Sequence, residues 1–174
     1  LGIMDMFLAS ERGNQDGVVE QAGIHMLYHS DNYYESTLTY YDNATNQMVL
    51  TANGIAYASL FKVFQNNKVY DAYSTSSDLV TDLPAVNAKA VDAGDDIKVF
   101  VVNKLPVNSP LNLTIDGTTY SGNYTLETYT ETINQSPPSY SDYSSAWTTT
   151  NASGAVSIPA YSIAIVTISK SNTV

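Results

Sequence analysis

Ile97-Lys98-Val99-Phe100-Val101-Val102-Asn103 is the stretch that decides the fold class. Most of its residues are β-branched or aromatic, and the turn signal Ala93-Gly94-Asp95-Asp96 comes directly before it. β-Branched and aromatic residues favour strands, whereas Gly and Asp are typical of turns. The stretch therefore predicts a central β-strand that begins after a hairpin turn.

Similar runs recur from residue 67 to the end of the chain, and turn-forming residues such as Asp116-Gly117 and Ser153-Gly154 separate them. Short strands at this spacing, with no helix between them, are typical of an antiparallel sandwich. We therefore predict a β-sandwich over residues 66–174. Its strand-like runs are Val69–Tyr73, Ala85–Val91, Ile97–Val102, Leu111–Ile115, Tyr120–Tyr129 and Ala155–Ile168.

The first 65 residues have a different pattern. Apolar residues at helical spacing predict a helix over 1–12, and a second helix is predicted over about 52–64, capped by Thr51 or Asn53. Between them, the apolar run 18–28 is typical of a strand buried on both faces in a parallel sheet, although its periodicity alone also permits a helix. Residues 29–50 are polar and aromatic and predict a long loop. Because the strand has no parallel partner within the 174 residues, we expect its neighbours to come from outside them.

Composition excludes several classes of function. The formal net charge of -10 disfavours nucleic acids and anionic membranes, and no run of about 18 apolar residues offers a membrane span. The lack of cysteine excludes disulfides, thiolate metal sites and a Cys nucleophile. We expect no metal, because the two histidines lack a third ligand at matching spacing, and no cofactor, because there is no Gly-rich phosphate loop.

Several features favour a secreted, extracellular glycoprotein. Asn-X-Ser/Thr triplets permit N-glycosylation, and four of them are candidate sites: Asn43, Asn112, Asn123 and Asn151. A fifth triplet, at Asn134, is followed closely by Pro137. The chain opens at Leu1 inside a predicted helix, which favours processing or truncation of a longer protein.

Four stretches resemble the last quarter of the family 51 α-L-arabinofuranosidases and related barrel glycosidases. Residues 7–19 are similar to the seventh barrel helix with its turn into strand eight, and residues 54–64 are similar to the eighth helix. Ile97–Asn103 resembles the sandwich strand that ends in Val-Val-Asn, and Ile158-Pro159-Ala160-Tyr161-Ser162-Ile163 resembles the lead into the final strand. The resemblance implies a mainly β fold: an antiparallel β-sandwich preceded by a helix–strand–helix remnant of a (β/α)8 barrel, with the remnant over 1–65 and the sandwich over 66–174.

The resemblance also implies a retaining glycosidase whose catalytic residues lie elsewhere. Such enzymes use two glutamates about 5–5.5 Å apart. In the family layout these glutamates lie at the ends of strands four and seven, both of which precede Leu1. We therefore expect no catalytic residue here, and we expect the partner to be a catalytic barrel, as another chain or as a missing N-terminal part. The function implied is the C-terminal part or small subunit of a secreted, arabinofuranosidase-like glycoside hydrolase acting on polysaccharide, with the sandwich supporting the barrel.

Five residues at the end of the predicted strand and in the following loop are candidate sugar contacts: His25, Tyr28, His29, Tyr33 and Tyr34. The C-terminal ends of barrel strands face the active site, and by the resemblance His25 stands where the family has a sugar-binding glutamine. Tyrosine rings can stack on the apolar C–H face of a sugar. Tyr40 and Tyr41 are further candidates for such stacking. The alternative is that these side chains are structural, with the imidazole satisfied by backbone groups and the tyrosines packed in the loop.

Two other classes of function stay open. One is a carbohydrate-binding β-sandwich module that holds polysaccharide through tyrosines, with Trp147 as a further aromatic candidate or as a plug at the sandwich edge. The other is a structural, self-assembling surface protein, which the low content of charged residues and the abundant Tyr, Asn and Thr favour.

Overall fold

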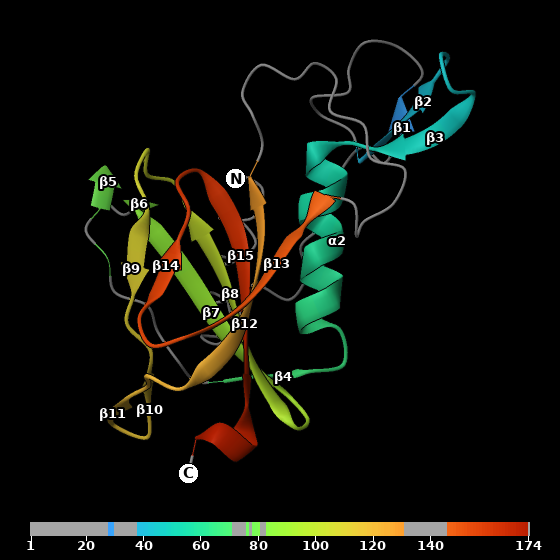
Figure 1. Cartoon of the computed structure of the whole chain (residues 1–174). Coiled ribbons are helices and arrows are strands. Elements are labelled where there is room, and N and C mark those ends of the chain that lie inside the picture. Colours follow the sequence, from blue (N-terminus) through green and yellow to red (C-terminus); the bar gives the residue numbers. More distant parts are fainter. Residues whose placement is uncertain are drawn as a thin grey trace, which may run out of the picture. The chain divides into compact units, whose positions relative to one another are not determined.

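The structure is a computed structural model that describes residues 28–29, 38–70, 76, 78–80, 83–130 and 146–173. These residues form two compact units. The sandwich unit holds the described residues of 63–130 and 148–173, and the hairpin–helix unit holds 28–29, 38–62 and 146–147. The fold is mainly β with antiparallel sheets, which confirms the predicted class (Figure 1).

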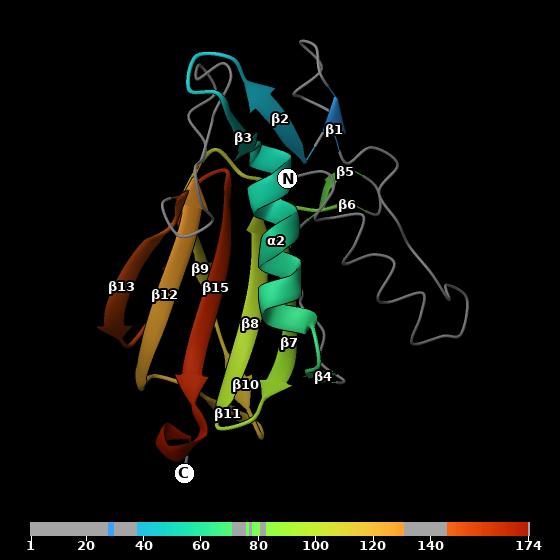
Figure 2. The same cartoon turned by 90° about the vertical axis from the view of Figure 1, so that its right-hand side faces the viewer.

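A six-stranded antiparallel sheet is the main layer of the sandwich unit (Figure 2). Its strand order is β13 (Thr148–Ser153), β12 (Asn123–Thr130), β15 (Ser162–Ser169), β8 (Asp96–Asn103), β7 (Val86–Ala93) and β4 (Lys68–Val69). The predicted turn at residues 93–96 connects β7 to β8, with Gly94 at a φ of +76°. Three short pairs complete the unit: β14 (Val156–Ile158) with β9 (Ser109–Leu111), β10 (Thr114–Ile115) with β11 (Thr118–Thr119), and β5 (Asp78–Val80) with β6 (Leu83–Pro84). A 3-10 turn, η3 (Lys170–Asn172), follows β15.

The core of the sandwich unit lies between the large sheet and the β9–β14 pair. Val99 and Val101 of β8 stand opposite Val166 and Ala164 of β15, and all four are buried. Val156 and Ile158 of β14 belong to the same buried cluster, so β14 and β9 form a second layer over this face (Figure 1).

The opposite faces of β8 and β15 are buried as well. Phe100 and Val102 stand opposite Ile165 and Ile163 in the ladder, and the ring of Phe64 meets that of Phe100 edge to face at 5.9 Å. A strand buried on both faces has no position for exposed polar residues. This explains why Ile97–Asn103 is a nearly continuous apolar run instead of an alternating one.

Asn103 connects three parts of the sandwich unit at the end of β8. Its fully buried amide group donates from Nδ2 to the carbonyl oxygens of Val107 at 3.1 Å, Ile158 at 3.2 Å and Pro159 at 2.8 Å. Its Oδ1 accepts from Leu105 N at 3.0 Å and from Ser109 Oγ at 3.2 Å. The two sandwich motifs identified in the sequence, Val-Val-Asn and Ile-Pro-Ala-Tyr-Ser, are therefore bonded to each other.

The second predicted helix is α2 (Ala52–Phe64), with the predicted bounds, and its residues 52–62 belong to the hairpin–helix unit. Thr51 caps it, because its Oγ1 accepts from Gly54 N at 3.0 Å and its carbonyl accepts from Ile55 N at 2.9 Å. Asn66, at a φ of +62°, ends the helix in the left-handed conformation.

Gly54 is required by a close backbone approach. Thr51 donates to the carbonyl oxygen of Leu38 from both N, at 3.1 Å, and Oγ1, at 3.3 Å. A Cβ atom on Gly54 would lie 2.0 Å from the same oxygen. Packing of α2 against Leu38 therefore requires a glycine at this position in the first turn.

The prediction of a long loop over 29–50 is wrong for residues 39–50, and residues 30–37 lie outside the described residues. Residues 39–50 form a hairpin of β2 (Thr39–Asp42) and β3 (Gln47–Leu50), and β1 (Tyr28–His29) pairs parallel with β2. Tyr40 and Tyr41 are residues of β2, and residues 43–46 form the turn.

Three strand predictions also need correction. Pro159–Tyr161 divides the run 155–168 into β14 and β15, with Tyr161 at a φ of +47°, and the run 111–115 is divided between β9 and β10. The Thr-rich stretch 148–153 was not predicted and forms β13, because pairing with β12 stabilises a strand that has no apolar pattern of its own. The predicted helix 1–12 and residues 18–27 of the predicted strand lie outside the described residues, and the boundary at 65/66 stays a prediction. The expectation that the neighbours of this strand come from outside the chain is wrong for Tyr28, which pairs parallel with Thr39.

Replacing Asn103 with Leu should lower the free energy of unfolding by about 3 kcal/mol, because buried carbonyl and N–H groups lose their partners. Asn108→Ala is the matched control, since it removes one exposed bond, from Ala160 N to Asn108 Oδ1 at 3.1 Å. Urea unfolding followed by circular dichroism measures both. An equal, small loss in the two variants would contradict the role assigned to Asn103.

Gly54→Ala should destabilise the protein by about 2 kcal/mol, because the steric cost exceeds the better helix propensity of Ala. Ala58→Gly in the same helix calibrates the propensity effect at about 1 kcal/mol. Thermal unfolding of the two variants is the measurement. A Gly54→Ala protein more stable than the parent would show that Leu38 does not approach the helix in this way.

Candidate functional site

Two of the five predicted sugar contacts lie in a described element. Tyr28 and His29 form β1, where they stand opposite Thr39 and Tyr40 of β2 in a parallel register. The backbone thus brings these two positions next to the aromatic hairpin. His25, Tyr33 and Tyr34 lie outside the described residues, so the sugar-contact role of all five stays a prediction.

The β2–β3 hairpin presents an exposed pair that the loop prediction missed. Tyr41 and Met48 stand directly opposite each other and are 36% and 50% exposed. The hydroxyl of Tyr41 donates to Oδ1 of Asn46, which adopts a φ of +57° at the end of the turn. A tyrosine ring held in this way offers a fixed apolar face. The sequence signal was the turn Asn43–Asn46 between a Tyr-rich and an apolar segment, which is typical of a hairpin.

Asp42 organises the turn of this hairpin. Its carboxylate accepts from Thr45 Oγ1 at 2.7 Å and from Ala44 N at 2.9 Å. These bonds, that of Thr45 first, lower the pKa of Asp42 below its usual value. The ionised carboxylate therefore stabilises the turn at neutral pH, and this contribution is lost when the pH falls through the lowered pKa.

The four candidate glycosylation sites are all exposed. Asn43 lies in the β2–β3 turn and Asn112 lies between β9 and β10. Asn123 and Asn151 lie on the neighbouring strands β12 and β13, where Asn151 Oδ1 accepts from Thr125 Oγ1 at 2.8 Å.

An apolar groove opens beside β7 in the sandwich unit. Its volume is about 1050 Å³, and its lining includes Val86, Ala88 and Ala90 of β7 together with Leu111 and Leu113. Among the described residues that line it, Asp116 is the one carboxylate. Hydrolysis of a glycosidic bond commonly uses two carboxylates.

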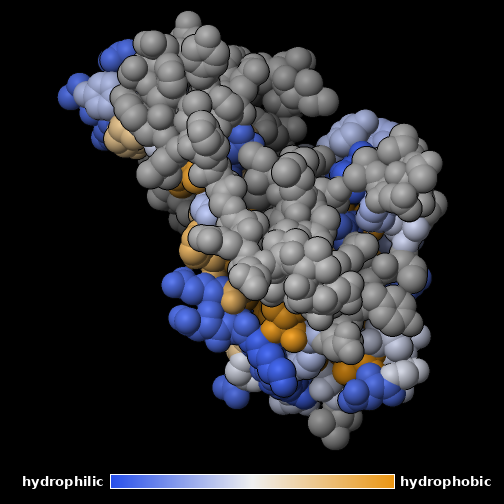
Figure 3. All heavy atoms as spheres, turned by 180° about the vertical axis from the view of Figure 1, so that it is seen from behind, coloured by the Kyte–Doolittle hydropathy of each residue, from blue (hydrophilic) through white to orange (hydrophobic). Residues whose placement is uncertain are grey.

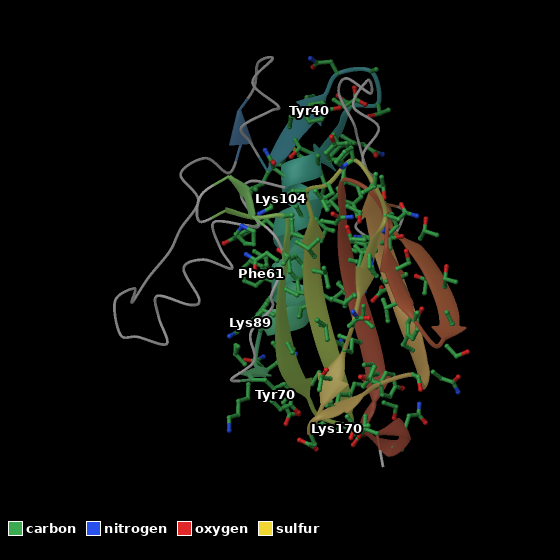
Figure 4. The ribbon with its side chains drawn as sticks, turned by 90° about the vertical axis from the view of Figure 1, so that its left-hand side faces the viewer. Tyr40, Phe61, Tyr70, Lys89, Lys104 and Lys170 are labelled. Atoms are coloured by element: carbon green, nitrogen blue, oxygen red, sulfur yellow. The ribbon has the colours of Figure 1, made fainter. Side chains whose placement is uncertain are left out.

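Polar groups at the far end of this unit have a structural arrangement. Lys170 Nζ, at the end of β15, donates to Asp92 Oδ1 at 2.6 Å and to the carbonyl of Gly94 at 2.5 Å (Figure 4). The bond to Asp92 raises the pKa of Lys170, and the bond from Lys170 lowers the pKa of Asp92. This ion pair fixes η3 to the β7–β8 turn.

On the one face that Figure 3 shows, the coloured atoms include both hydrophobic and hydrophilic residues. The large hydrophobic side chains most exposed are Tyr41, Met48, Phe61, Val107 and Tyr161. Trp147 is half-buried. The described residues include no helix long and apolar enough to span a membrane.

No protein-family model and no curated protein sequence matches this chain. Solved structures do. An arabinose-bound family 51 α-L-arabinofuranosidase matches over 94% of this chain and 26% of its own, at 18% identity and a TM-score of 0.58. The family 51 α-L-arabinofuranosidase of Thermotoga petrophila matches over 92% and 36%, at 12% identity and a TM-score of 0.59. The family 30 xylanase C of Talaromyces cellulolyticus matches over 94% and 35%, at 16% identity and a TM-score of 0.54.

The protein therefore has a glycoside hydrolase-like fold. The predicted resemblance to family 51 α-L-arabinofuranosidases is confirmed at the level of the fold, and the chain spans about a quarter to a third of the length of these enzymes.

Removing the hydroxyl of residue 45 should raise the pKa of Asp42 toward its usual value of about 3.9. We expect this in Thr45→Val, whereas Thr45→Ser keeps the donor and the lowered pKa. An NMR titration of the Asp42 carboxyl carbon measures both variants. An unchanged midpoint in Thr45→Val would contradict the turn geometry.

Proposed function

We propose that this chain is the C-terminal part or small subunit of a secreted, arabinofuranosidase-like glycoside hydrolase that acts on polysaccharide. The sandwich unit supports the catalytic barrel. The segment 25–34, with His25, Tyr28, His29, Tyr33 and Tyr34, lines the sugar site. The two catalytic glutamates belong to the barrel, which is either a separate chain or the preceding part of the same polypeptide.

The observation that carries the proposal is the extent of the fold match. Matches over 92–94% of this chain account for only 26–36% of each enzyme. A fragment of that size, composed of a sandwich and a few flanking elements, fits a supporting role. The parallel pairing of β1 with β2 adds local support, because it places Tyr28 and His29 next to a hairpin whose tyrosine ring is held in place.

The test compares hydrolysis of 4-nitrophenyl α-L-arabinofuranoside by three preparations. These are this chain alone, the proposed catalytic barrel (the upstream part) alone, and the two together. We expect no hydrolysis by this chain, and we expect it to raise the activity of the upstream part. Hydrolysis by the pure 174-residue chain would overturn the proposal, as would an upstream part that is fully active and unaffected by it.

In the active assembly, His25→Ala should lower kcat/KM about tenfold, because one hydrogen bond to the sugar is lost. Tyr161→Ala is the matched control, since Tyr161 is an exposed aromatic residue of the sandwich unit at 43% exposure. Equal kcat/KM values for the His25 variant and the parent would contradict the assignment of this residue to the sugar site.

A carbohydrate-binding module is the second candidate function, and the exposed Tyr41–Met48 pair favours it. The chain alone would then be retarded in affinity electrophoresis through soluble arabinan or xylan, and Tyr41→Ala would abolish the retardation. The leading proposal expects no retardation of the isolated chain.

A further inference from the structure

Within the described ranges, strand β13 forms an edge of the six-stranded sheet. Among the described residues it pairs with β12 alone, and five of its six residues are exposed. An edge strand presents unpaired N–H and C=O groups, to which a strand of another molecule can bond. Such edges are commonly protected by short length, charges, proline or a bulge.

The two edges of this sheet differ in their protection. The opposite edge, β4, has two residues and begins with Lys68. In contrast, β13 is the six-residue sequence Thr-Thr-Thr-Asn-Ala-Ser, with no charge and no proline, and its register with β12 contains no bulge. Its one distinguishing feature is the triplet Asn151-Ala152-Ser153.

The geometry of Asn151 suits an N-linked glycan. Its side chain is exposed, and its Oδ1 accepts from Thr125 Oγ1 at 2.8 Å. A glycan attaches to Nδ2, so the bond through Oδ1 would persist and would hold the base of the glycan at the middle of the edge strand.

A second triplet faces the first across the ladder. Asn123 stands opposite Ser153, and Thr125 stands opposite Asn151, so the two asparagines are diagonal neighbours about 7–8 Å apart. A glycan on Asn151 would crowd one on Asn123. Asn151 lies on the outer strand, whereas Asn123 lies on a strand with neighbours on both sides, β13 and β15.

We propose that Asn151 carries an N-linked glycan and that this glycan prevents β13 from pairing with β13 of a second copy of the chain. In the modification, Nδ2 forms a bond to the anomeric carbon of a lipid-linked oligosaccharide. The bond from that carbon to the phosphate oxygen breaks, the lipid phosphate group leaves with the electron pair, and Nδ2 loses one proton to a base of the transferase. The inference rests on the secretion included in the proposed function.

The experiment expresses the 174-residue chain behind a supplied signal peptide in a eukaryotic secretory host. Peptide mapping after enzymatic deglycosylation in ¹⁸O-labelled water measures occupancy at Asn151, and size-exclusion chromatography with light scattering measures the molar mass. We expect an occupied monomer. We expect dimers or larger species in Ser153→Ala, which removes the triplet but keeps Asn151 as an uncharged residue.

Two further variants make the outcome specific to the edge. Adding Thr149→Lys to Ser153→Ala should restore the monomer, because it places a charge on β13 opposite Glu127. Thr114→Ala removes the triplet at Asn112 and should leave the protein monomeric. A secreted chain unmodified at Asn151 would overturn the proposal, as would a Ser153→Ala protein that stays monomeric at every concentration. Because the signal peptide is supplied, neither result depends on whether the natural protein is secreted or hydrolytic.

Discussion

The fully buried amide group of Asn103 is the interaction on which the sandwich unit depends most. Five hydrogen bonds connect it to the loop after β8 and to the corner between β14 and β15. A buried amide can be accommodated only when its donors and acceptors are satisfied. The residue therefore fixes the path by which the chain leaves the second layer at Ile158 and enters the central strand β15 at Ser162. This path positions the apolar side chains of both strands between the layers.

This constraint explains why the sequence resemblance to the family 51 enzymes is carried by these two motifs. Val-Val-Asn and Ile-Pro-Ala-Tyr-Ser lie far apart in the chain, yet they meet at Asn103. Both motifs maintain the corner of the sandwich. A resemblance carried by such residues identifies a fold, which the matched enzymes share at identities of 12–18%. Substrate and activity depend on residues outside these motifs.

Sequence reasoning was most successful where a single local pattern determined the structure. The bounds of α2 followed from the apolar spacing and from Thr51, and the central strand followed from its run of β-branched residues. Sequence-based prediction failed where contacts with a distant segment of the same chain determined the structure. Nothing apolar marks Thr148–Ser153 as a strand, because β12 supplies the hydrogen bonds that form it. The sequence also does not identify Gly54 as a packing requirement, because the approach of Leu38 depends on the pairing of β2 with β3. Of the candidate site, the position of Tyr28 and His29 next to the hairpin required the unexpected parallel pairing, whereas His25, Tyr33 and Tyr34 remain sequence-based predictions.

We propose that this chain has a structural role in a larger enzyme, and the position of the catalytic nucleophile tests this proposal most directly. A retaining glycosidase forms a covalent glycosyl-enzyme through one carboxylate. The decisive measurement is therefore peptide mapping of the active assembly after reaction with a slow, fluorinated arabinofuranoside that accumulates this intermediate. The account predicts that the label is on a glutamate outside these 174 residues. A label on any carboxylate within them would contradict it.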